Sequence, residues 1–212
     1  MNNEPSLMDL ARDERTDLAE FLATLTPAQW QTESLCTGWT VKDVVAHVIS
    51  YEELSISGLL KRFAKGRIVR ANEVGVAEYS TKSTDELLLF LNEHLRPQGL
   101  TAGFGGMIGL VDGTVHHQDI RRALGRPRTV PAQRLQRILP LVPGNPRLGA
   151  GKRIKGLRLR ANDIDWEHGS GPEVTGTGEA LLLAMTGRRQ AAEELTGTGA
   201  STLLSRCCGR GR

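Results

Sequence analysis

Apolar residues recur every three or four positions over four stretches of the first 125 residues, a spacing that predicts helices. The first helix is expected over residues 6–25. A short turn of helix should follow at 26–30, where Pro27 can take the first helical position. The second stretch, residues 40–66, starts with the spacing of a capping box and predicts one long helix.

A third helix is predicted over residues 83–96, with a looser helical turn over 71–79 before it. The fourth is expected to start near Phe104 and to end at Gly125, which a proline follows closely. Four helices joined by loops bury their apolar stripes most easily as an antiparallel bundle. We therefore expect residues 1–126 to form a four-helix bundle.

The pattern changes after this bundle. Residues 127–152 are rich in Pro, Gly and Arg and indicate a linker with one short helix. Residues 153–205 alternate polar and apolar positions and then resume helical spacing after Thr177, which predicts a small α+β module. Residues 206–212 are expected to be a basic tail. The expected fold class is thus α+β, with an antiparallel four-helix bundle followed by a small α+β module.

The composition is that of a soluble globular protein, with 39% hydrophobic and 24% charged residues. No apolar run approaches the length of about 18 residues that a membrane span needs, and the start of the chain lacks the order of a signal peptide. We therefore expect a cytoplasmic protein with no membrane partner. Three cysteines, Cys36, Cys207 and Cys208, give no disulfide framework and are expected as reduced thiols.

The net charge of +3 is mild but unevenly distributed, because residues 126–160 carry many Arg and Lys and no Asp or Glu. This segment is either a solvated basic surface or a surface for phosphate or carboxylate groups. No nucleic-acid motif and no interleaved aromatic residues accompany it, so a nucleic-acid partner is not expected. The expected oligomeric state is a monomer or a homodimer.

The fourth helix places polar residues inside its apolar face. On a helical wheel Asp112, His116 and Asp119 fall between two apolar flanks, where an unpaired charge is costly. On the second helix, His47 also falls inside the apolar arc. The residues of the fourth helix that are expected to point outward are Thr114, His117, Gln118 and Arg121.

Together, His47, Asp112 and His116 offer two imidazole nitrogens and one carboxylate oxygen. This is the ligand set of an open site for Zn²⁺ or a related divalent ion. The alternative is structural: Arg62 or Arg122 neutralises the acid, and each histidine is a hydrogen-bonded core residue. Three such residues on two helices favour the metal site.

Other residues near these helices have more ordinary interpretations. Asp119 either orients a ligand histidine or is a surface ion-pair partner. Cys36 has no histidine at a recognisable partnering spacing and is expected as a buried or loop thiol. Trp39 and Trp166 are expected as packing anchors.

Two segments, "LCTGWTVKDVVAHVISYEE" and "VHHQDIRRALGRP", resemble the mycothiol-dependent maleylpyruvate isomerase family, a branch of the DinB-like metal-binding four-helix bundles. The C-terminal "GLRLRANDIDWEHGSGPEVTGTGEALLLAMTGRR" is similar to the small sterol-carrier-like domain that follows the bundle in that family. The resemblance covers nearly the whole chain. It implies metal-ligand positions at His47, Asp112 and His116, with Asp112 standing where the family usually has Glu.

The resemblance also implies a function. A divalent ion, Zn²⁺ in the first instance, would keep the sulfur of mycothiol or a similar small thiol as the reactive thiolate, which adds to an electrophilic substrate. The protein would be an isomerase if elimination follows the addition, or an S-transferase if the adduct is the product. Cations from the segment after Gly125 would bind substrate carboxylates.

Two other functions stay open. The shorter side chain of Asp112 is compatible with a non-catalytic metal-binding stress-response protein of the same fold. The basic segment 126–160 is compatible with an interaction module for an acidic partner, whose binding would depend on salt.

Overall fold

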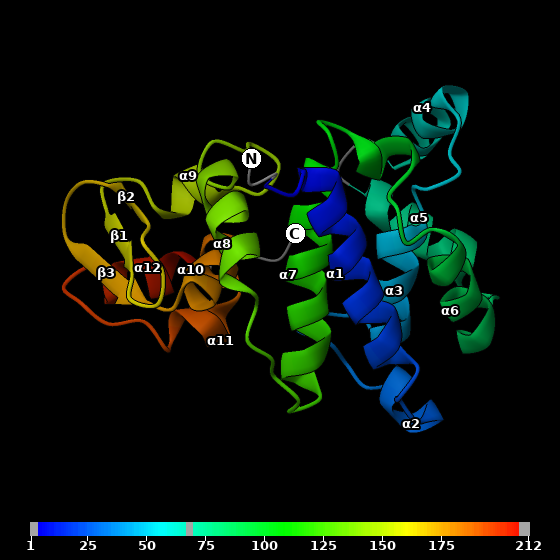
Figure 1. Ribbon diagram of the computed structural model, residues 1–212, viewed down its shortest axis with the longest axis horizontal. Coiled ribbons are helices and arrows are strands. Elements are labelled where there is room, and N and C mark those ends of the chain that lie inside the picture. Colours follow the sequence, from blue (N-terminus) through cyan, green and yellow to red (C-terminus); the bar gives the residue numbers. More distant parts are fainter. Residues whose placement is uncertain (1–3, 67–69, 208–212) are drawn as a thin grey trace. The chain divides into compact units, whose positions relative to one another are not determined.

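The computed structural model describes residues 4–66 and 70–207, and the chain divides into two compact units, Met1–Arg128 and Thr129–Arg212. The first unit is helical, and the second combines short helices with a three-stranded sheet (Figure 1). This confirms the predicted α+β class. Within the described ranges, no helix is both long and apolar enough to cross a lipid bilayer.

Four helices of the first unit form the bundle: α1 (Leu7–Leu22), α3 (Val41–Ile49), α6 (Thr84–Glu93) and α7 (Met107–Ala123). The connecting elements are α2 (Pro27–Trp30), α4 (Ile56–Lys65), α5 (Ala71–Tyr79) and the 3₁₀ turn η1 (Gly99–Ala102). The helical turn predicted over 71–79 is therefore a helix of two and a half turns. Capping boxes begin α1, α2, α3 and α6, and their cap residues are Ser6, Thr26, Thr40 and Ser83.

Neighbouring helices of the bundle run in mixed directions. Gly106 packs against Met8, and the Arg121 guanidinium lies over the Phe21 ring, so α1 and α7 run parallel. By contrast α6 runs antiparallel to α1, and α3 runs antiparallel to α7 (Figure 1). The antiparallel arrangement expected from the sequence thus holds for α1 with α6 and for α3 with α7, but α1 and α7 run parallel, and so do the contacting helices α3 and α6.

The single long helix expected over residues 40–66 is wrong, because α3 ends at Ile49 and α4 begins at Ile56. Polar side chains cause the break. The Ser55 hydroxyl accepts a backbone N–H of the next turn and starts a new helix, while the Glu52 carboxylate turns into the interior. Side chains that bond to nearby backbone or leave the helix surface in this way compete with a continuous helix.

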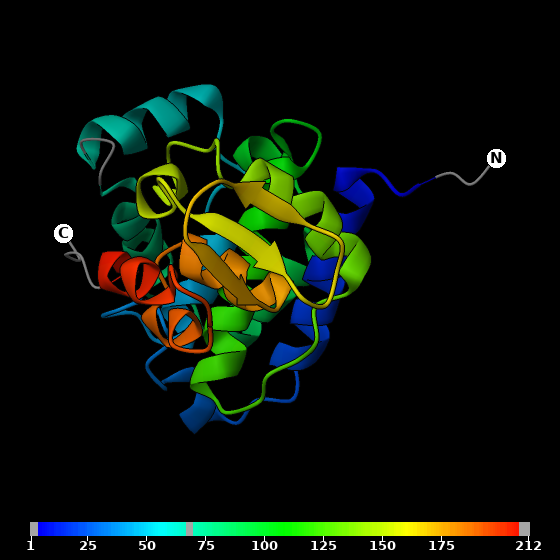
Figure 2. The same ribbon diagram turned by 90° about the vertical axis from the view of Figure 1, so that its left-hand side faces the viewer.

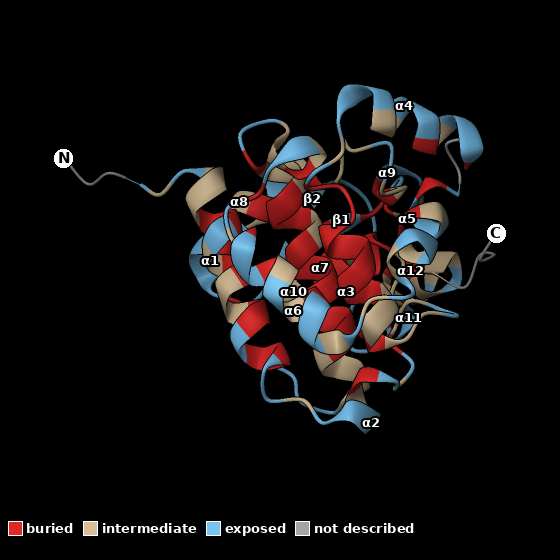
Figure 3. Ribbon diagram, turned by 90° about the vertical axis from the view of Figure 1, so that its right-hand side faces the viewer, coloured by how far each residue is buried: buried red, intermediate tan, exposed pale blue. Residues whose placement is uncertain are grey.

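Aliphatic side chains fill the interior of the first unit, and α3 and α7 are buried along much of their length (Figure 3). This agrees with the low aromatic content of 4%. The core cluster consists of Leu18, Ala19, Phe21, Leu22, Trp30, Val41, Val44, Val45, Ala46, Val48, Ile49, Leu87, Leu91 and Ile120.

A buried ion pair ties α1 to the segments that follow α3 and α6. Arg15 Nη2 lies 2.5 Å from Glu52 Oε1, and Arg15 Nη1 donates to the His94 carbonyl oxygen at 2.7 Å. Glu52 also accepts from the Gln98 backbone N–H at 2.7 Å and from the Thr101 hydroxyl at 2.5 Å. Since one guanidinium and two further donors bind the Glu52 carboxylate, its buried charge is compensated.

The second unit contains a sheet of order β2-β1-β3 (Figure 2). Strand β1 (Arg158–Ala161) pairs antiparallel with β2 (Glu167–Gly169) and parallel with β3 (Glu173–Gly176). Leu159 and Val174 are paired in register and fully buried. The helices of this unit are α8 (Ala132–Ile138), η2 (Leu139–Leu141), α9 (Ala150–Arg153), α10 (Gly178–Met185), α11 (Arg189–Ala192) and α12 (Ala200–Cys207).

The segment expected as a linker, residues 127–152, is folded. It supplies α8, η2 and α9, and the buried side chains of Leu135 and Leu139 pack close to Gly178 at the start of α10. The one short helix expected there is α8. A reading of Pro and Gly content does not detect the buried apolar residues of this segment, which are Val130, Leu135, Ile138, Leu139, Val142 and Ala150.

Arg206 and Cys207, which were expected in the basic tail, are the last two residues of α12. Arg206 Nη1 donates to the carbonyl oxygens of Arg153 at 2.7 Å and Lys155 at 2.8 Å. Cys207 Sγ lies 3.3 Å from the Ala184 carbonyl oxygen. Residues 208–212, with Cys208, lie outside the described residues.

Replacing Arg15 by Met should lower the free energy of unfolding by about 3 kcal/mol, because it leaves the Glu52 carboxylate buried without its cation. Arg12→Met is the matched control, since Arg12 lies on the same helix in an exposed pair with Asp13. The control should lower the free energy of unfolding far less, because water screens an exposed ion pair. Urea unfolding of both variants measures the difference, and equal losses would contradict the account of the buried pair.

Candidate metal centre

Three side chains from two helices converge in the first unit. His47 lies in the last turn of α3, and Asp112 and His116 lie one turn apart on α7, which runs antiparallel to α3. Asp112 Oδ1 is 3.5 Å from His47 Nε2 and 3.5 Å from His116 Nε2. One ligand atom from each residue lies within 4.8 Å of the other two. The structure thus brings together the three residues that the sequence singled out.

The two imidazoles meet edge to face, with ring centroids 4.8 Å apart and an interplanar angle of 84°. Both are buried, at 5% exposed for His47 and 9% for His116, whereas the Asp112 side chain is 32% exposed. The carboxylate therefore lies on the solvent-facing side of the cluster, and the two imidazole rings lie on its buried side.

The cluster is electrostatically coupled. Burial alone would raise the pKa of the Asp112 carboxyl, but the neighbouring His116 and His47 outweigh burial and hold that pKa well below its ordinary value. Burial alone would lower the pKa of His116, but Asp112 outweighs it and raises that pKa well above the usual range. Asp112 is therefore ionised, and His116 holds a proton that an incoming cation would displace.

The donor set fits a divalent cation. Two ligand atoms that each lie about 2.0–2.1 Å from a tetrahedral ion are about 3.3 Å apart, close to the two distances of 3.5 Å at Asp112. Those distances are long for a hydrogen bond. Among the described residues, His47 Nδ1 is buried with no hydrogen-bond partner, so hydrogen bonding does not account for the position of this ring.

The alternative to a metal site was that Arg62 or Arg122 neutralises the Asp112 carboxylate, and the position of Arg62 does not support it. Its guanidinium is used elsewhere, because Nη1 donates to the Ser50 carbonyl oxygen at 2.7 Å and Nη2 lies 2.5 Å from Glu78 Oε2. Arg122 lies ten residues beyond Asp112 on α7, about 15 Å along the helix axis. Neither arginine is the partner of the Asp112 carboxylate.

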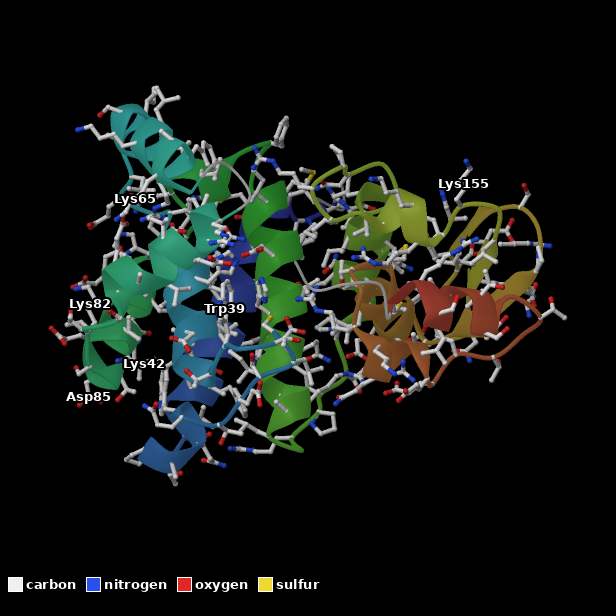
Figure 4. The ribbon with its side chains drawn as sticks, turned by 180° about the vertical axis from the view of Figure 1, so that it is seen from behind. Trp39, Lys42, Lys65, Lys82, Asp85 and Lys155 are labelled. Carbon is white, nitrogen blue, oxygen red and sulfur yellow. The ribbon has the colours of Figure 1, made fainter. Side chains whose placement is uncertain are left out.

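Aromatic residues border His47. The Trp39 ring lies 5.2 Å from the His47 ring and between α3 and α7 (Figure 4), and the Tyr51 ring meets His47 edge-on at 6.2 Å. Trp39 also packs on the core cluster, as expected for a packing anchor. In the second unit Trp166 stacks nearly parallel to His168, with ring centroids 6.2 Å apart.

Cys36 and Asp119 lie behind His116. His116 Nδ1 is 2.9 Å from Asp119 Oδ2, and Cys36 Sγ is 3.1 Å from the same oxygen and 3.5 Å from His116 Nδ1. Asp119 is fully buried, so its interpretation as a surface ion-pair partner is wrong. The sequence missed the contact of Cys36 with a histidine because 80 positions separate the two residues and only the fold brings them together.

His117 is buried, so its predicted position on the surface is wrong. Its Nδ1 lies 2.8 Å from Glu14 Oε1, and Arg121 Nε donates to its Nε2 at 2.8 Å. Thr114 and Gln118, also expected outside, are buried as well. The wheel assumed one buried face, but α7 packs against α1 on one side and α3 on the other.

The basic segment contributes two arginines to the first unit. Arg128 pairs with Glu14 and, at 3.2 Å, with Asp17, and the Arg126 guanidinium lies 4.8 Å from the Phe21 ring centre. Both side chains contact residues of α1 and stabilise the bundle there. The expectation that cations just after Gly125 bind a substrate carboxylate therefore has no support from these two residues.

Residues 11–95 match the family model described as the mycothiol maleylpyruvate isomerase N-terminal domain. The matched stretch lies in the helical unit and runs from α1 to the end of α6. The match includes His47 and ends before α7, so Asp112 and His116 lie beyond it. The resemblance predicted from the sequence is thereby confirmed for the bundle.

Two solved structures share the fold over 92% of the chain. One is the crystal structure of the mycothiol-dependent maleylpyruvate isomerase, with a TM-score of 0.64, 15% sequence identity and 92% of each chain covered. The other is that of a histidine-to-alanine mutant of this enzyme, with a TM-score of 0.64, 16% identity and the same coverage. At this identity the likeness shows the fold. Comparison with curated proteins gives no significant match.

His117 should make stability depend on pH. Burial lowers the pKa of this histidine from 6.5 to about 4 in the folded chain. As pH falls from 6.5 to 4, the unfolded chain binds a proton that the folded chain does not, so stability from this group is complete above pH 6.5 and falls by about 3 kcal/mol toward pH 4.

The His117→Gln variant should therefore lose less stability than the wild type over this pH window. Urea unfolding at several pH values gives the comparison, and His168→Gln, at an exposed position of β2, controls for the loss of an imidazole. Parallel pH profiles for the wild type and His117→Gln would show that the buried histidine is not held neutral.

Proposed function

We propose that this chain is a divalent-metal-dependent enzyme that uses a low-molecular-weight thiol, as an isomerase or an S-transferase. The observation that carries the proposal is the convergence of His47, Asp112 and His116, with one ligand atom from each within 4.8 Å of the others. The family of the bundle supports the choice of thiol, because the two structural neighbours are named as mycothiol-dependent maleylpyruvate isomerases. Mycothiol is accordingly the first thiol to test.

The residues present have distinct roles in this proposal. His47, Asp112 and His116 would hold the cation, Zn²⁺ in the first instance, although Ni, Fe and Mn accept the same ligand types. When bound, a divalent cation would supply Lewis-acid stabilisation of a thiolate. Asp112 stays ionised at the solvent-facing side of the cluster, where the thiol and the electrophile can approach.

The aromatic residues beside His47 favour a reactive thiolate at the candidate centre. The rings of Trp39 and Tyr51 border His47 and shield it from water. A thiolate in such surroundings is less hydrated and adds readily to an electrophilic carbon. Elimination after rotation about the former double bond gives an isomer, whereas release of the adduct gives an S-conjugate.

A second candidate is a non-catalytic metal-binding protein of the same fold. Asp112 favours it, because its side chain is one methylene shorter than the Glu of the family resemblance and is followed by Gly113, which weakens the helix by about 1 kcal/mol relative to Ala. Both candidates require the cation. They differ in whether a thiol is bound and turned over.

Purified protein reconstituted with Zn²⁺ should bind about one equivalent, because a single set of three ligands holds it. His47→Ala and His116→Ala should each lower the affinity at least about 100-fold, since two protein ligands hold a cation poorly. Calorimetric titration with Zn²⁺ measures the loss, and His168→Ala is the matched control. Unchanged affinity in both ligand variants would remove the basis of the proposal.

Asp112→Glu separates the two candidates. In an enzyme, the longer carboxylate should keep metal affinity within about tenfold and change the rate of thiol addition, because the cation moves relative to the substrate by roughly a methylene. Titration of the Zn²⁺-loaded protein with mycothiol, followed by maleylpyruvate turnover, gives both readouts. Zinc binding with no thiol binding in either form would favour the non-catalytic candidate.

A further inference from the structure

The two histidines of the candidate centre differ in what lies behind them. His116 Nδ1 is 2.9 Å from an oxygen of Asp119, a carboxylate with 0% exposure. His47 Nδ1 is buried and has no hydrogen-bond partner in the part of the chain that the structure describes. The Nδ1 atom of His116 therefore has a hydrogen-bond partner, and the Nδ1 atom of His47 has none among the described residues.

The loop that precedes α3, residues 34–39, contacts Asp119. Within this loop, the Ser34 hydroxyl lies 2.8 Å from the Trp39 carbonyl oxygen and accepts the Cys36 N–H at 3.1 Å. The loop contacts α7 at two points: the Leu35 backbone N–H donates to the Asp119 carbonyl oxygen at 3.3 Å, and the Cys36 thiol donates to Asp119 Oδ2 at 3.1 Å. The same short loop thus places Cys36 behind one histidine and Trp39 against the other.

Asp119 Oδ2, which both His116 Nδ1 and Cys36 Sγ contact, indicates which of these atoms carries a hydrogen. An ionised carboxylate only accepts, so both atoms close to Asp119 Oδ2 must donate. When a cation displaces the proton on Nε2, the neutral His116 ring keeps its hydrogen on Nδ1, and the lone pair of Nε2 points toward Asp112 and His47. We propose that Asp119, held by the Cys36 thiol, is a positioning residue that sets this tautomer of His116 and aims Nε2 at the cation; the role rests on the proposed function.

Cys36, His116 and Asp119 are also close enough to be considered as cation ligands themselves. The distances argue for hydrogen bonds instead. The 2.9 Å from His116 Nδ1 to Asp119 Oδ2 and the 3.1 Å from Cys36 Sγ to the same oxygen are hydrogen-bond lengths. Ligands of one tetrahedral zinc lie about 3.3–3.5 Å apart, which is the spacing found at Asp112 and not at Asp119.

The first test needs no metal. Long-range ¹H–¹⁵N correlation on the metal-free protein at alkaline pH, where imidazoles are neutral, should show His116 protonated at Nδ1. Asp119→Leu should shift it to the Nε2–H form, and Asp119→Asn, whose amide oxygen can still accept, should restore Nδ1–H. His47 in the same spectrum is the internal control and should not respond. A His116 that keeps Nδ1–H in Asp119→Leu would overturn the proposal.

The second test measures affinity for Zn²⁺. Loss of such a hydrogen bond typically weakens metal binding about 10- to 100-fold, and we expect this for Asp119→Leu with a smaller loss for Asp119→Asn. Thermal unfolding without metal identifies a variant that merely fails to fold. Equal affinity in the wild type and Asp119→Leu would overturn the role. If no form binds Zn²⁺, the proposed function fails, while the tautomer measurement still decides what Asp119 does.

The third test separates a thiol that holds Asp119 from a thiol that binds metal. The Co²⁺-loaded protein should lack the near-ultraviolet absorption of a cobalt–thiolate bond, and Cys36→Ser, which keeps a donor, should retain affinity within about threefold. Cys36→Ala should lower the affinity for the metal more than Cys36→Ser does, but less than Asp119→Leu does. A thiolate band in the wild type that disappears in Cys36→Ala would make Cys36 a ligand and overturn its part in the proposal.

Discussion

The antiparallel contact between α3 and α7 is the constraint on which the candidate centre depends. It sets the last turn of one helix against the middle of the other, so that His47 faces Asp112 and His116 across the interface. Neither helix carries the full ligand set. A rotation of either helix by one residue would turn its ligands away from the interface by about 100°, so core packing around Val44, Val48 and Leu110 maintains the site.

Helix α7 has polar residues on two buried faces. On the α3 side, Asp112 and His116 are coupled so that the acid is ionised and the histidine protonated. On the α1 side, Glu14 and Arg128 surround His117, whose ring stays neutral. Adjacent histidines thus adopt opposite protonation states, because Asp112 raises the pKa of His116 whereas burial lowers the pKa of His117 to about 4.

Local pattern predicted most of the bundle and the inward position of His47, Asp112 and His116, because helical periodicity and capping spacing are short-range signals. Prediction from local pattern failed where contacts between residues distant in the sequence determine the structure. The break after Ile49 depends on Glu52 finding Arg15, and the burial of His117 depends on α1 packing against α7. The contact of Cys36 with Asp119 spans 83 positions, which no spacing rule reaches. Asp119 itself was found because it lies three residues from His116 on one helix.

The parallel pairing of α1 with α7 has a consequence for how the chain folds. Glu14 and its partner His117 are 103 residues apart, and Arg128 lies still further along. Contacts of such high sequence separation form slowly, because a long loop must close before they contribute. During synthesis α1 cannot complete its packing until almost the whole first unit has emerged, so the bundle closes late and as one cooperative event.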